Sequence, residues 1–380
     1  MLLLVGWIVT SQTVRAANNG EQARNMVDAP LCLPGQGFQY SSDCLRAGPI
    51  EYLAKMADLG IKFPLSPLPY RKADQSLTAV PYYYAQVITD NAQMFGSLED
   101  AVQGEPVLRR LEGGFDFVTY IDAAEVQGKR YYMIDPGIWM NGKDLSRIGA
   151  TSSLQGLTFQ RTPNVQFGWI RNQTESKRSP GYIPNDYTGQ IYYRYDIVQI
   201  YDIKQVNDER WYMIGPDIWM EGRQVSRVIP DATPPEGVDN GRWIEVNLEE
   251  QTLAVYDQKR LVFAAIVATG QDGAWTQPGL FQIYMKKESE DMQGAFTADR
   301  SDYYYLEDVP WTMYFDQARA LHGTYWHSSF GYQQSSGCVN LSPGDANWLF
   351  SWAQEGDWVF VWDPSGQTPT DPGLYGSGGA

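Results

Sequence analysis

Apolar and polar positions alternate in short runs along much of the chain, which is the pattern of β-strands that bury one face. The clearest series begins at Arg242 and continues as Trp243–Leu248, Leu253–Tyr256 and Leu261–Thr269, with turns between the runs. Runs of this length joined by tight turns predict antiparallel strands. We therefore expect a mainly β protein whose largest domain, residues 242–363, is a β-sandwich or mixed sheet.

One helix start stands out against this strand-rich background. Ser342 is followed directly by Pro343 and, three positions after the serine, by Asp345. A serine side chain can accept a backbone N–H at the start of a helix, and proline suits the first helical position. We therefore predict one short capped helix that begins after Ser342.

The middle of the chain repeats itself at an offset of 80 residues. Tyr132–Gly142 and Tyr212–Gly222 share the pattern Tyr-Met-Ile-x-Pro-x-Ile-Trp-Met-x-Gly, and both copies continue to Ser-Arg. A match at a fixed offset indicates duplicated domains. Their short aromatic strands resemble paired bacterial SH3-like barrels, which we place at residues 81–155 and 156–236.

The two ends of the chain differ from its body. Residues 1–16 contain an apolar run too short to cross a bilayer comfortably, followed by small residues, which is typical of a signal peptide. The alternative is a retained membrane anchor, so we expect a secreted or envelope-bound protein. Residues 17–80 form an N-terminal segment, and the Pro- and Gly-rich residues 364–380 predict a disordered tail.

The charge balance limits the classes of partner. The chain has 45 acidic and 29 basic residues, a formal net charge of −16. A surface of this sign repels phosphate backbones. We therefore expect no nucleic-acid partner.

Three cysteines are present, and two of them lie close together in the sequence. Cys32 and Cys44 are the natural disulfide pair in an exported chain, whereas in a reducing compartment they would be free thiols. The pairing leaves Cys338 as the odd cysteine. Both histidines of the chain, His322 and His327, lie within 16 residues of Cys338.

This cluster predicts nucleophilic chemistry. A thiol becomes a useful nucleophile when a nearby imidazole takes its proton. Gly337, directly before Cys338, lets the backbone approach an acyl carbonyl closely, and N–H groups there could bind an oxyanion. Two histidines and one free cysteine have no zinc-like spacing, so we expect neither a metal nor a cofactor.

The same residues resemble a known family. Leu321-His-Gly-Thr-Tyr-Trp-His327, then Phe330-Gly331 and then Gly337-Cys-Val-Asn-Leu-Ser-Pro343 are similar to the signature of the YkuD-type L,D-transpeptidases. The resemblance implies that Cys338 is the nucleophile and His322 the base, with the Gly323 carbonyl orienting the imidazole. It implies an oxyanion and substrate region made of Gly337, Ser336, His327, Tyr325, Trp326 and Asn340.

The family resemblance also implies a reaction and its partners. The thiolate would attack a peptidoglycan stem peptide, release D-Ala and form a thioester that the amine of an acceptor stem resolves into a 3→3 cross-link. The repeats would bind wall glycopeptide and act in localisation, so residues 242–363 made alone should still acylate.

One departure from the signature leaves alternatives open. The family usually has histidine where this chain has Ser336. A catalytically impaired wall-binding or structural homologue is therefore one alternative, and an L,D-carboxypeptidase-type hydrolase is another. His327 could also take over the role of the missing imidazole.

Overall fold

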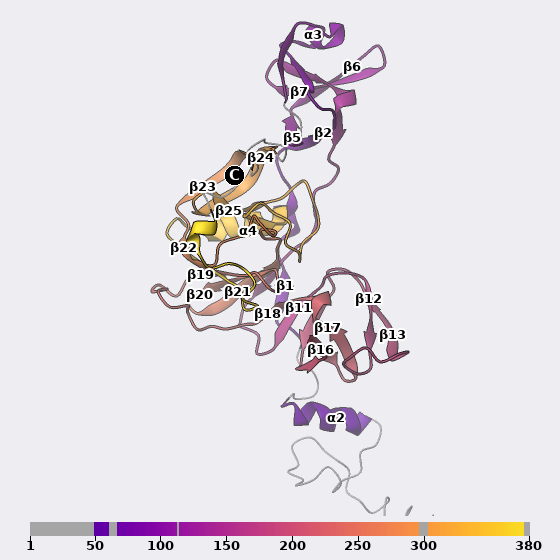
Figure 1. Cartoon of the computed structure of the whole chain (residues 1–380), viewed down its shortest axis with the longest axis vertical. Helices are drawn as coiled ribbons and strands as arrows, with labels where there is room; N and C mark the ends of the chain where they lie inside the picture. Colours follow the sequence, from indigo (N-terminus) through magenta and orange to yellow (C-terminus); the bar gives the residue numbers. More distant parts are fainter. Residues whose placement is uncertain (1–48, 61–66, 112–113, 296–302, 376–380) are drawn as a thin grey trace, which may run out of the picture.

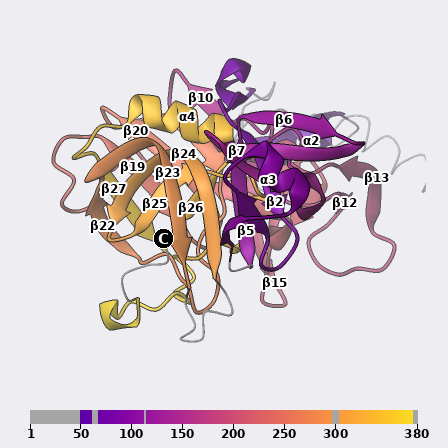
Figure 2. The same cartoon turned by 90° about the horizontal axis from the view of Figure 1, so that it is seen from above.

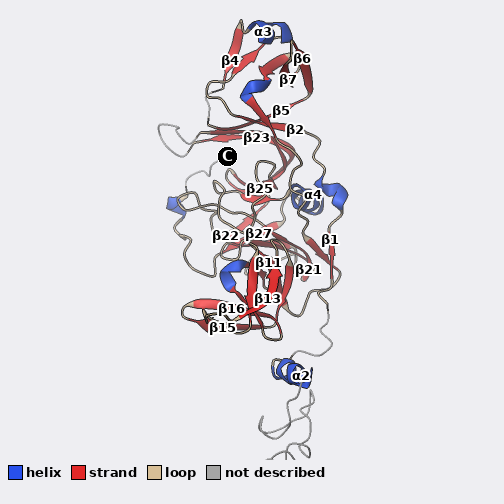
Figure 3. Cartoon of the chain, turned by 90° about the vertical axis from the view of Figure 1, so that its right-hand side faces the viewer, coloured by secondary structure: helices blue, strands red, loops and turns tan. Residues whose placement is uncertain are grey.

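The structure is a computed structural model that describes residues 49–60, 67–111, 114–295 and 303–375. Strands dominate these residues, as Figure 3 shows by colour, so the prediction of a mainly β protein is confirmed. The predicted signal peptide at 1–16 and the Cys32–Cys44 bridge lie outside the described residues. Figure 1 shows an elongated molecule in which the C-terminal domain lies between two smaller β units.

The first small unit contains a five-stranded sheet and three strands of a larger one. In spatial order the five-stranded sheet is β4 (Val107–Arg110), β3 (Gln93–Phe95), β8 (Ile138–Asn141), β7 (Lys129–Asp135) and β6 (Asp122–Val126). The other three strands are β5 (Phe115–Tyr120), β2 (Tyr83–Val87) and β9 (Leu145–Arg147). The helix α3 (Leu98–Gln103) and the 3₁₀ turn η2 (Gly142–Asp144) complete the unit.

The second small unit repeats this order of strands. Its five-stranded sheet is β13 (Tyr187–Tyr192), β12 (Thr174–Lys177), β17 (Ile218–Glu221), β16 (Glu209–Gly215) and β15 (Asp202–Val206). A three-stranded sheet of β14 (Ile197–Ile200), β11 (Gln166–Ile170) and β18 (Val225–Val228) follows, with η3 (Gly222–Gln224) before β18. The duplication in the sequence is therefore a duplication in structure, while the likeness to SH3 barrels stays a prediction.

The helix α2 (Pro49–Asp58) lies against the second unit. Its Met56 is buried in a cluster with Trp211, Met213 and Trp219. Trp219 is therefore a core residue, and Trp139 packs half-buried at the corresponding place of the first unit. This part of the N-terminal segment is thus tied to the repeat.

The C-terminal domain is built on a seven-stranded sheet. Its order is β1 (Tyr70–Lys72), β10 (Leu157–Phe159), β21 (Arg260–Ile266), β20 (Thr252–Asp257), β19 (Trp243–Asn247), β27 (Trp358–Trp362) and β22 (Gly279–Gln282). The antiparallel meander β19–β20–β21 confirms the strands predicted from alternation. β27 returns from the end of the domain to pair in parallel with β19.

A second sheet crosses from the C-terminal domain into the first small unit. It runs β26 (Val339–Leu341), β25 (Arg319–Gly323), β24 (Tyr304–Asp316), β5, β2 and β9, and β23 (Met285–Gly294) also pairs with β24. β24 and β5 are parallel, with Tyr304 opposite Phe115 and Leu306 opposite Phe117. In Figure 2 the labels of β23, β24, β25 and β26 lie next to those of β5 and β2.

The predicted helix is α4 (Pro343–Trp352). The hydroxyl of Ser342 accepts the Asp345 N–H at 3.2 Å, as the capping pattern predicts. Leu349 of α4 packs with residues of both sheets in one fully buried core. The core thus lies between the sheets and holds their facing strands in place.

The two sheets extend beyond residues 242–363, the bounds expected for the catalytic domain. β1 and β10, which we placed in the N-terminal segment and the second repeat, extend the seven-stranded sheet, and β5 of the first repeat extends the other. The turn η1 (Gln75–Thr78) also lies on α4, where Asn347 Nδ2 donates to the Leu77 carbonyl at 3.2 Å. Alternation reveals strands but not their distant partners, so the sequence could not show this interlocking.

The tail differs from its prediction over residues 364–375. Here the chain forms the 3₁₀ turn η4 (Pro372–Leu374), and Tyr375 is only 7% exposed. The Tyr375 ring lies 5.2 Å from the Arg319 guanidinium, which donates to the Tyr375 carbonyl. Disorder is therefore wrong for these residues, because one aromatic anchor at the end orders a polar stretch.

No helix among the described residues is long and apolar enough to cross a membrane.

Candidate active site

The site is built on the paired parallel strands β25 and β26. Leu321 lies opposite Val339, and His322 lies opposite Asn340. Successive side chains of a strand point to opposite faces. Leu321 and Val339 therefore enter the core, while His322, Asn340 and Cys338, which directly precedes β26, share the other face.

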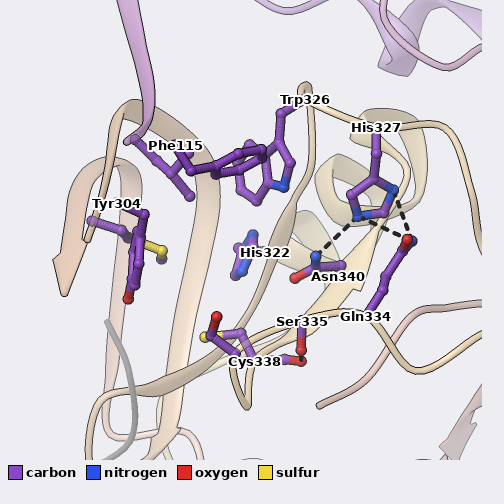
Figure 4. A pocket seen from close by; sticks show the side chains of 12 residues that line it. Phe115, Tyr304, His322, Trp326, His327, Gln334, Ser335, Cys338 and Asn340 are labelled. Atoms are coloured by element: carbon purple, nitrogen blue, oxygen red, sulfur yellow. Dashed lines mark hydrogen bonds between the residues drawn. The ribbon is translucent and has the colours of Figure 1, made fainter. Parts of the chain in front are cut away.

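This face opens into a cavity of about 430 Å³. One side of it is mostly apolar and the other is polar, as Figure 4 shows. The lining residues are Phe115, Met292, Tyr304, Leu306, His322, Trp326, His327, Gln334, Ser335, Ser336, Cys338 and Asn340. The cavity can thus take a substrate that presents both aliphatic and hydrogen-bonding groups.

The Cys338 thiol is a protonated group at rest. Its side chain is buried. The sulfur Sγ accepts a hydrogen bond from the Ala320 N–H at 3.4 Å and lies 3.9 Å from the Ala318 carbonyl oxygen. Burial raises the pKa of the thiol to about 11, although the Ala320 N–H and the Arg319 charge act to lower it. The thiol therefore needs a base to become a nucleophile at neutral pH.

His322 has the state that such a base requires. Its Nδ1 lies 3.1 Å from the Gly323 carbonyl, which can only accept, so Nδ1 carries the proton and Nε2 has the free lone pair. Burial lowers the pKa of His322 to about 4, against a raising effect of the same carbonyl. The ring is therefore neutral near pH 7.

Two glycines are fixed by lack of space. A Cβ on Gly323 would lie 3.0 Å from Pro310 Cγ and 3.2 Å from the Pro310 carbonyl, so a larger residue would crowd β24. Gly337 has a φ of +115°, a left-handed conformation that favours glycine, and its Cβ would lie 3.3 Å from Arg319 Nε. At this position the backbone carbonyl of Gly323 is thus the group that contacts the His322 ring.

A further residue, Ser335, fastens the loop that carries the nucleophile. Its hydroxyl donates to the Cys338 carbonyl at 2.5 Å and accepts the Gly337 N–H at 3.3 Å. The Gly337 N–H is therefore engaged within the loop. Sequence reasoning missed Ser335, although a serine shortly before a Gly-Cys turn is a known pattern of local hydrogen bonding.

The other predicted site residues divide into two groups. Ser336, Trp326, His327 and Asn340 line the cavity. Tyr325 instead stacks on Tyr84 with ring centroids 3.5 Å apart. The structure therefore gives Tyr325 a packing role against the first unit rather than a place at the substrate.

Sequence reasoning also missed the apolar wall of the cavity. Phe115 belongs to the first repeat, yet its pairing with Tyr304 places it at the mouth of the cavity, where it is 44% exposed. Met292 and Leu306 complete this wall from β23 and β24. Only the long-range pairing of β5 with β24 brings Phe115 here, and no local pattern signals it.

A metal centre would need several histidine, cysteine or acidic side chains close together. Nowhere in the described ranges do three or more histidine, cysteine or acidic side chains come together in a metal-binding arrangement.

Comparisons with known proteins place this domain. Residues 241–361 match the family model of the YkuD L,D-transpeptidase catalytic domain. No curated protein matches the chain. Among solved structures, an L,D-transpeptidase from Stackebrandtia nassauensis is 29% identical over 36% of this chain and 60% of its own, with a TM-score of 0.27.

Two further solved structures are similar to parts of the chain. The catalytic domain of the Enterococcus faecium L,D-transpeptidase is 25% identical over 33% of this chain and all of its own, with a TM-score of 0.29. An L,D-transpeptidase from Mycobacterium smegmatis is 14% identical over 55% of this chain and 90% of its own, with a TM-score of 0.31. From the match of the family model, we conclude that residues 241–361 are a YkuD-type L,D-transpeptidase catalytic domain.

Proposed function

We propose that the chain is a peptidoglycan L,D-transpeptidase that works through a thioester on Cys338 and forms 3→3 cross-links. One observation carries the proposal. The paired strands β25 and β26 present Cys338, His322 and Asn340 on one face of a cavity, with His322 in the tautomer of a base. This face is where an acyl carbonyl could meet the thiol and the imidazole together.

The reaction proceeds by two acyl transfers. His322 Nε2 takes the proton of the Cys338 thiol as Sγ attacks the carbonyl carbon of the bond before the terminal D-Ala. The carbon–nitrogen bond then breaks, and the imidazolium gives its proton to the leaving D-Ala amine. An acceptor amine attacks the thioester and passes a proton to His322, the carbon–sulfur bond breaks, and the thiolate regains that proton.

The burial of the site favours this order of events. Thiol and imidazole are both neutral at rest, and separated charges in a site of low polarity are costly. Charge therefore develops only during attack, when the substrate is bound and hydrogen bonds can stabilise it. A buried imidazole with a free Nε2 supports an active enzyme over the catalytically impaired alternative.

The location and the small units complete the proposal. Stem peptides lie outside the cell membrane, so the enzyme is secreted or held at the envelope by its N-terminal segment. Binding of wall glycopeptide by the repeats is supported by exposed tyrosines on the second unit. Tyr182 and Tyr187 are 50% and 48% exposed, and Lys177 lies over both rings at 5.6 and 5.0 Å.

An assay with both a donor stem and an acceptor stem distinguishes transpeptidation from hydrolysis by the products that form. The full chain is incubated with a tetrapeptide stem and a second stem that bears a free side-chain amine, and the products are identified by mass spectrometry. We expect release of D-Ala together with a cross-linked dimer. Release of D-Ala with tripeptide as the sole other product would instead establish the L,D-carboxypeptidase alternative.

A further inference from the structure

The side chain of Asn340 holds a buried polar atom without a partner. Asn340 is 3% exposed, and its Oδ1 has no hydrogen-bond partner among the described residues. Its Nδ2 lies 3.1 Å from His327 Nε2. Figure 4 shows the Asn340 oxygen turned away from His327, on the side of His322 and Cys338. A buried amide oxygen without a partner is costly, so its orientation needs an explanation.

The surroundings of His327 fix its tautomer. The Ser329 N–H donates to His327 Nδ1 at 3.3 Å, and the Gln334 amide nitrogen lies 3.1 Å from the same atom and 3.4 Å from Nε2. A ring nitrogen that accepts from a backbone N–H carries no proton itself. Burial lowers the pKa of His327 to about 4, so the ring is neutral near pH 7 and its proton is on Nε2.

The Nε2–H of His327 therefore faces an amide nitrogen that also donates. Two donors cannot bond to each other. A half-turn of the Asn340 amide brings Oδ1 to Nε2–H and removes the unpartnered oxygen. Since amide oxygen and nitrogen differ little in size, the turn needs no extra space. After it, the Asn340 NH₂ group occupies the position that faces the cavity.

From this geometry we infer that Asn340 donates a hydrogen bond to the acyl carbonyl of the substrate, and that His327 is the positioning residue that holds its amide in the donating orientation. Cys338 and Asn340 are two positions apart and share one face, so the carbonyl that the thiol attacks lies within reach of the amide. The identity of the ligand as an acyl group rests on the proposed function, whereas the amide orientation does not.

Asn340 and His327 together offer a hydrogen-bond donor of the kind that a histidine at position 336 could have supplied. A developing oxyanion needs hydrogen-bond donors, and the side chain of Ser336, which lines the cavity, has one O–H and no N–H. A neutral amide donor also suits a site in which burial keeps both histidines uncharged. In this account His327 does not take over as a base but acts through Asn340.

The first test needs no substrate. Nitrogen-15 NMR of the full chain with labelled histidine reports which ring nitrogen of His327 is protonated. We expect the Nε2–H tautomer in the parent protein, with that proton lost from slow exchange in Asn340→Leu because its acceptor is removed. A His327 ring protonated on Nδ1 would overturn the inference even if the enzyme is an active transpeptidase.

The second test separates the donor from the nucleophile. Asn340→Leu should lower the rate of acylation by on the order of 10²-fold with a smaller change in KM, the usual effect of losing one oxyanion donor. His327→Phe should also lower it, and His327→Gln should restore part because its amide can donate to Asn340. The rate of thiol modification by methyl methanethiosulfonate, which forms no oxyanion, should stay within about twofold in all three.

Unchanged acylation in Asn340→Leu would overturn the donor role, and so would an equal loss of thiol modification, because the defect would then lie in the nucleophile or the fold. A parent chain that fails to acylate with any stem would sink the proposed function, while the tautomer measurement would still decide the amide orientation.

Discussion

At the scale of single residues, burial sets the protonation state of the site. The Cys338 thiol and the His322 imidazole are both neutral at rest, the thiol with a pKa of about 11 and the ring with a pKa of about 4. This arrangement differs from an enzyme that stores a ready thiolate–imidazolium pair. Reactivity then depends on proton transfer during attack rather than on a thiolate population.

Titration of the thiolate tests this state. We expect the ultraviolet absorbance of the Cys338 thiolate to rise with a midpoint near pH 11, because the pKa of the buried thiol is raised to about that value. Cys338→Ser is the control, and reduced Cys32 and Cys44 must be blocked or bridged for a clean signal. A midpoint below about pH 7 would mean that the site stabilises a thiolate, as low-pKa catalytic cysteines do.

The lowered pKa of His322 predicts how stability depends on pH. The folded-state pKa of about 4 lies below the ordinary value of 6.5, so the unfolded chain binds the extra proton between these values. Stability from this group is therefore present above about pH 6.5 and lost as the pH falls toward 4. Its size is on the order of 3 kcal/mol for a shift of this extent.

Urea unfolding at pH 7 and pH 4.5 measures that loss. His322→Gln, which keeps a hydrogen-bond donor but does not titrate, should lose less free energy of unfolding than the parent chain over this interval. Equal losses in the two proteins would show that the His322 ring is not held neutral in the folded state.

At the scale of elements, local sequence patterns predicted strands and a helix start correctly, but they did not predict which distant strands pair. The β19–β20–β21 meander and the cap of α4 follow from alternation and from the Ser342, Pro343 and Asp345 pattern, both of which act within a few residues. That His322 and Cys338 both line one cavity agrees with what their spacing and the signature predicted. The pairing of β5 with β24, which adds Phe115 to the cavity, joins segments almost 190 residues apart and leaves no local trace.

The start of α4 carries a buried acid with a testable effect. Asp345 accepts the Gly156 N–H at 2.5 Å, and burial raises the pKa of its carboxyl from 3.8 to about 7. A raised pKa means that the folded state loses stability as the pH rises from about 4 through 7. Asp345→Asn should therefore gain free energy of unfolding relative to the parent as the pH rises from 5 to 8, by roughly 1–4 kcal/mol.

Urea unfolding of both proteins at pH 5 and pH 8 measures the difference. Asp100→Asn is the matched control, since Asp100 stands at the same place relative to the N-cap Ser97 in the short helix α3. The control should show no comparable gain. If the gain in free energy of unfolding of Asp345→Asn does not grow with pH, the pKa of the Asp345 carboxyl is not raised in the folded protein.

The crossing sheets predict the behaviour of fragments. Residues 242–363 alone would leave the edges of β21 and β24 without their partners β10 and β5 and would lack Phe115. We therefore expect this fragment to be insoluble or to acylate at least tenfold more slowly than residues 67–375. Comparison of the two by circular dichroism and stem acylation is the measurement, and equal rates would show that the first unit does not help to build the site.

At the scale of the whole molecule, the chain encloses its catalytic domain. The first unit adds strands and a cavity wall on one side, and the second unit lies on the other. Tyr375 anchors the tail on Arg319. The small units therefore help to build the sheets and the cavity of the C-terminal domain. Sequence patterns identified the duplication but gave no sign that a repeat would share a sheet with the catalytic domain.

Intact-mass analysis of the full chain with a tetrapeptide stem tests whether Cys338 carries the acyl group. We expect an adduct equal to the stem without its terminal D-Ala, mapped by peptide analysis to Cys338. The adduct should be absent in Cys338→Ser and form at least about 10²-fold more slowly in His322→Ala, the usual effect of losing a general base. An adduct on another residue, or full acylation in His322→Ala, would contradict the account.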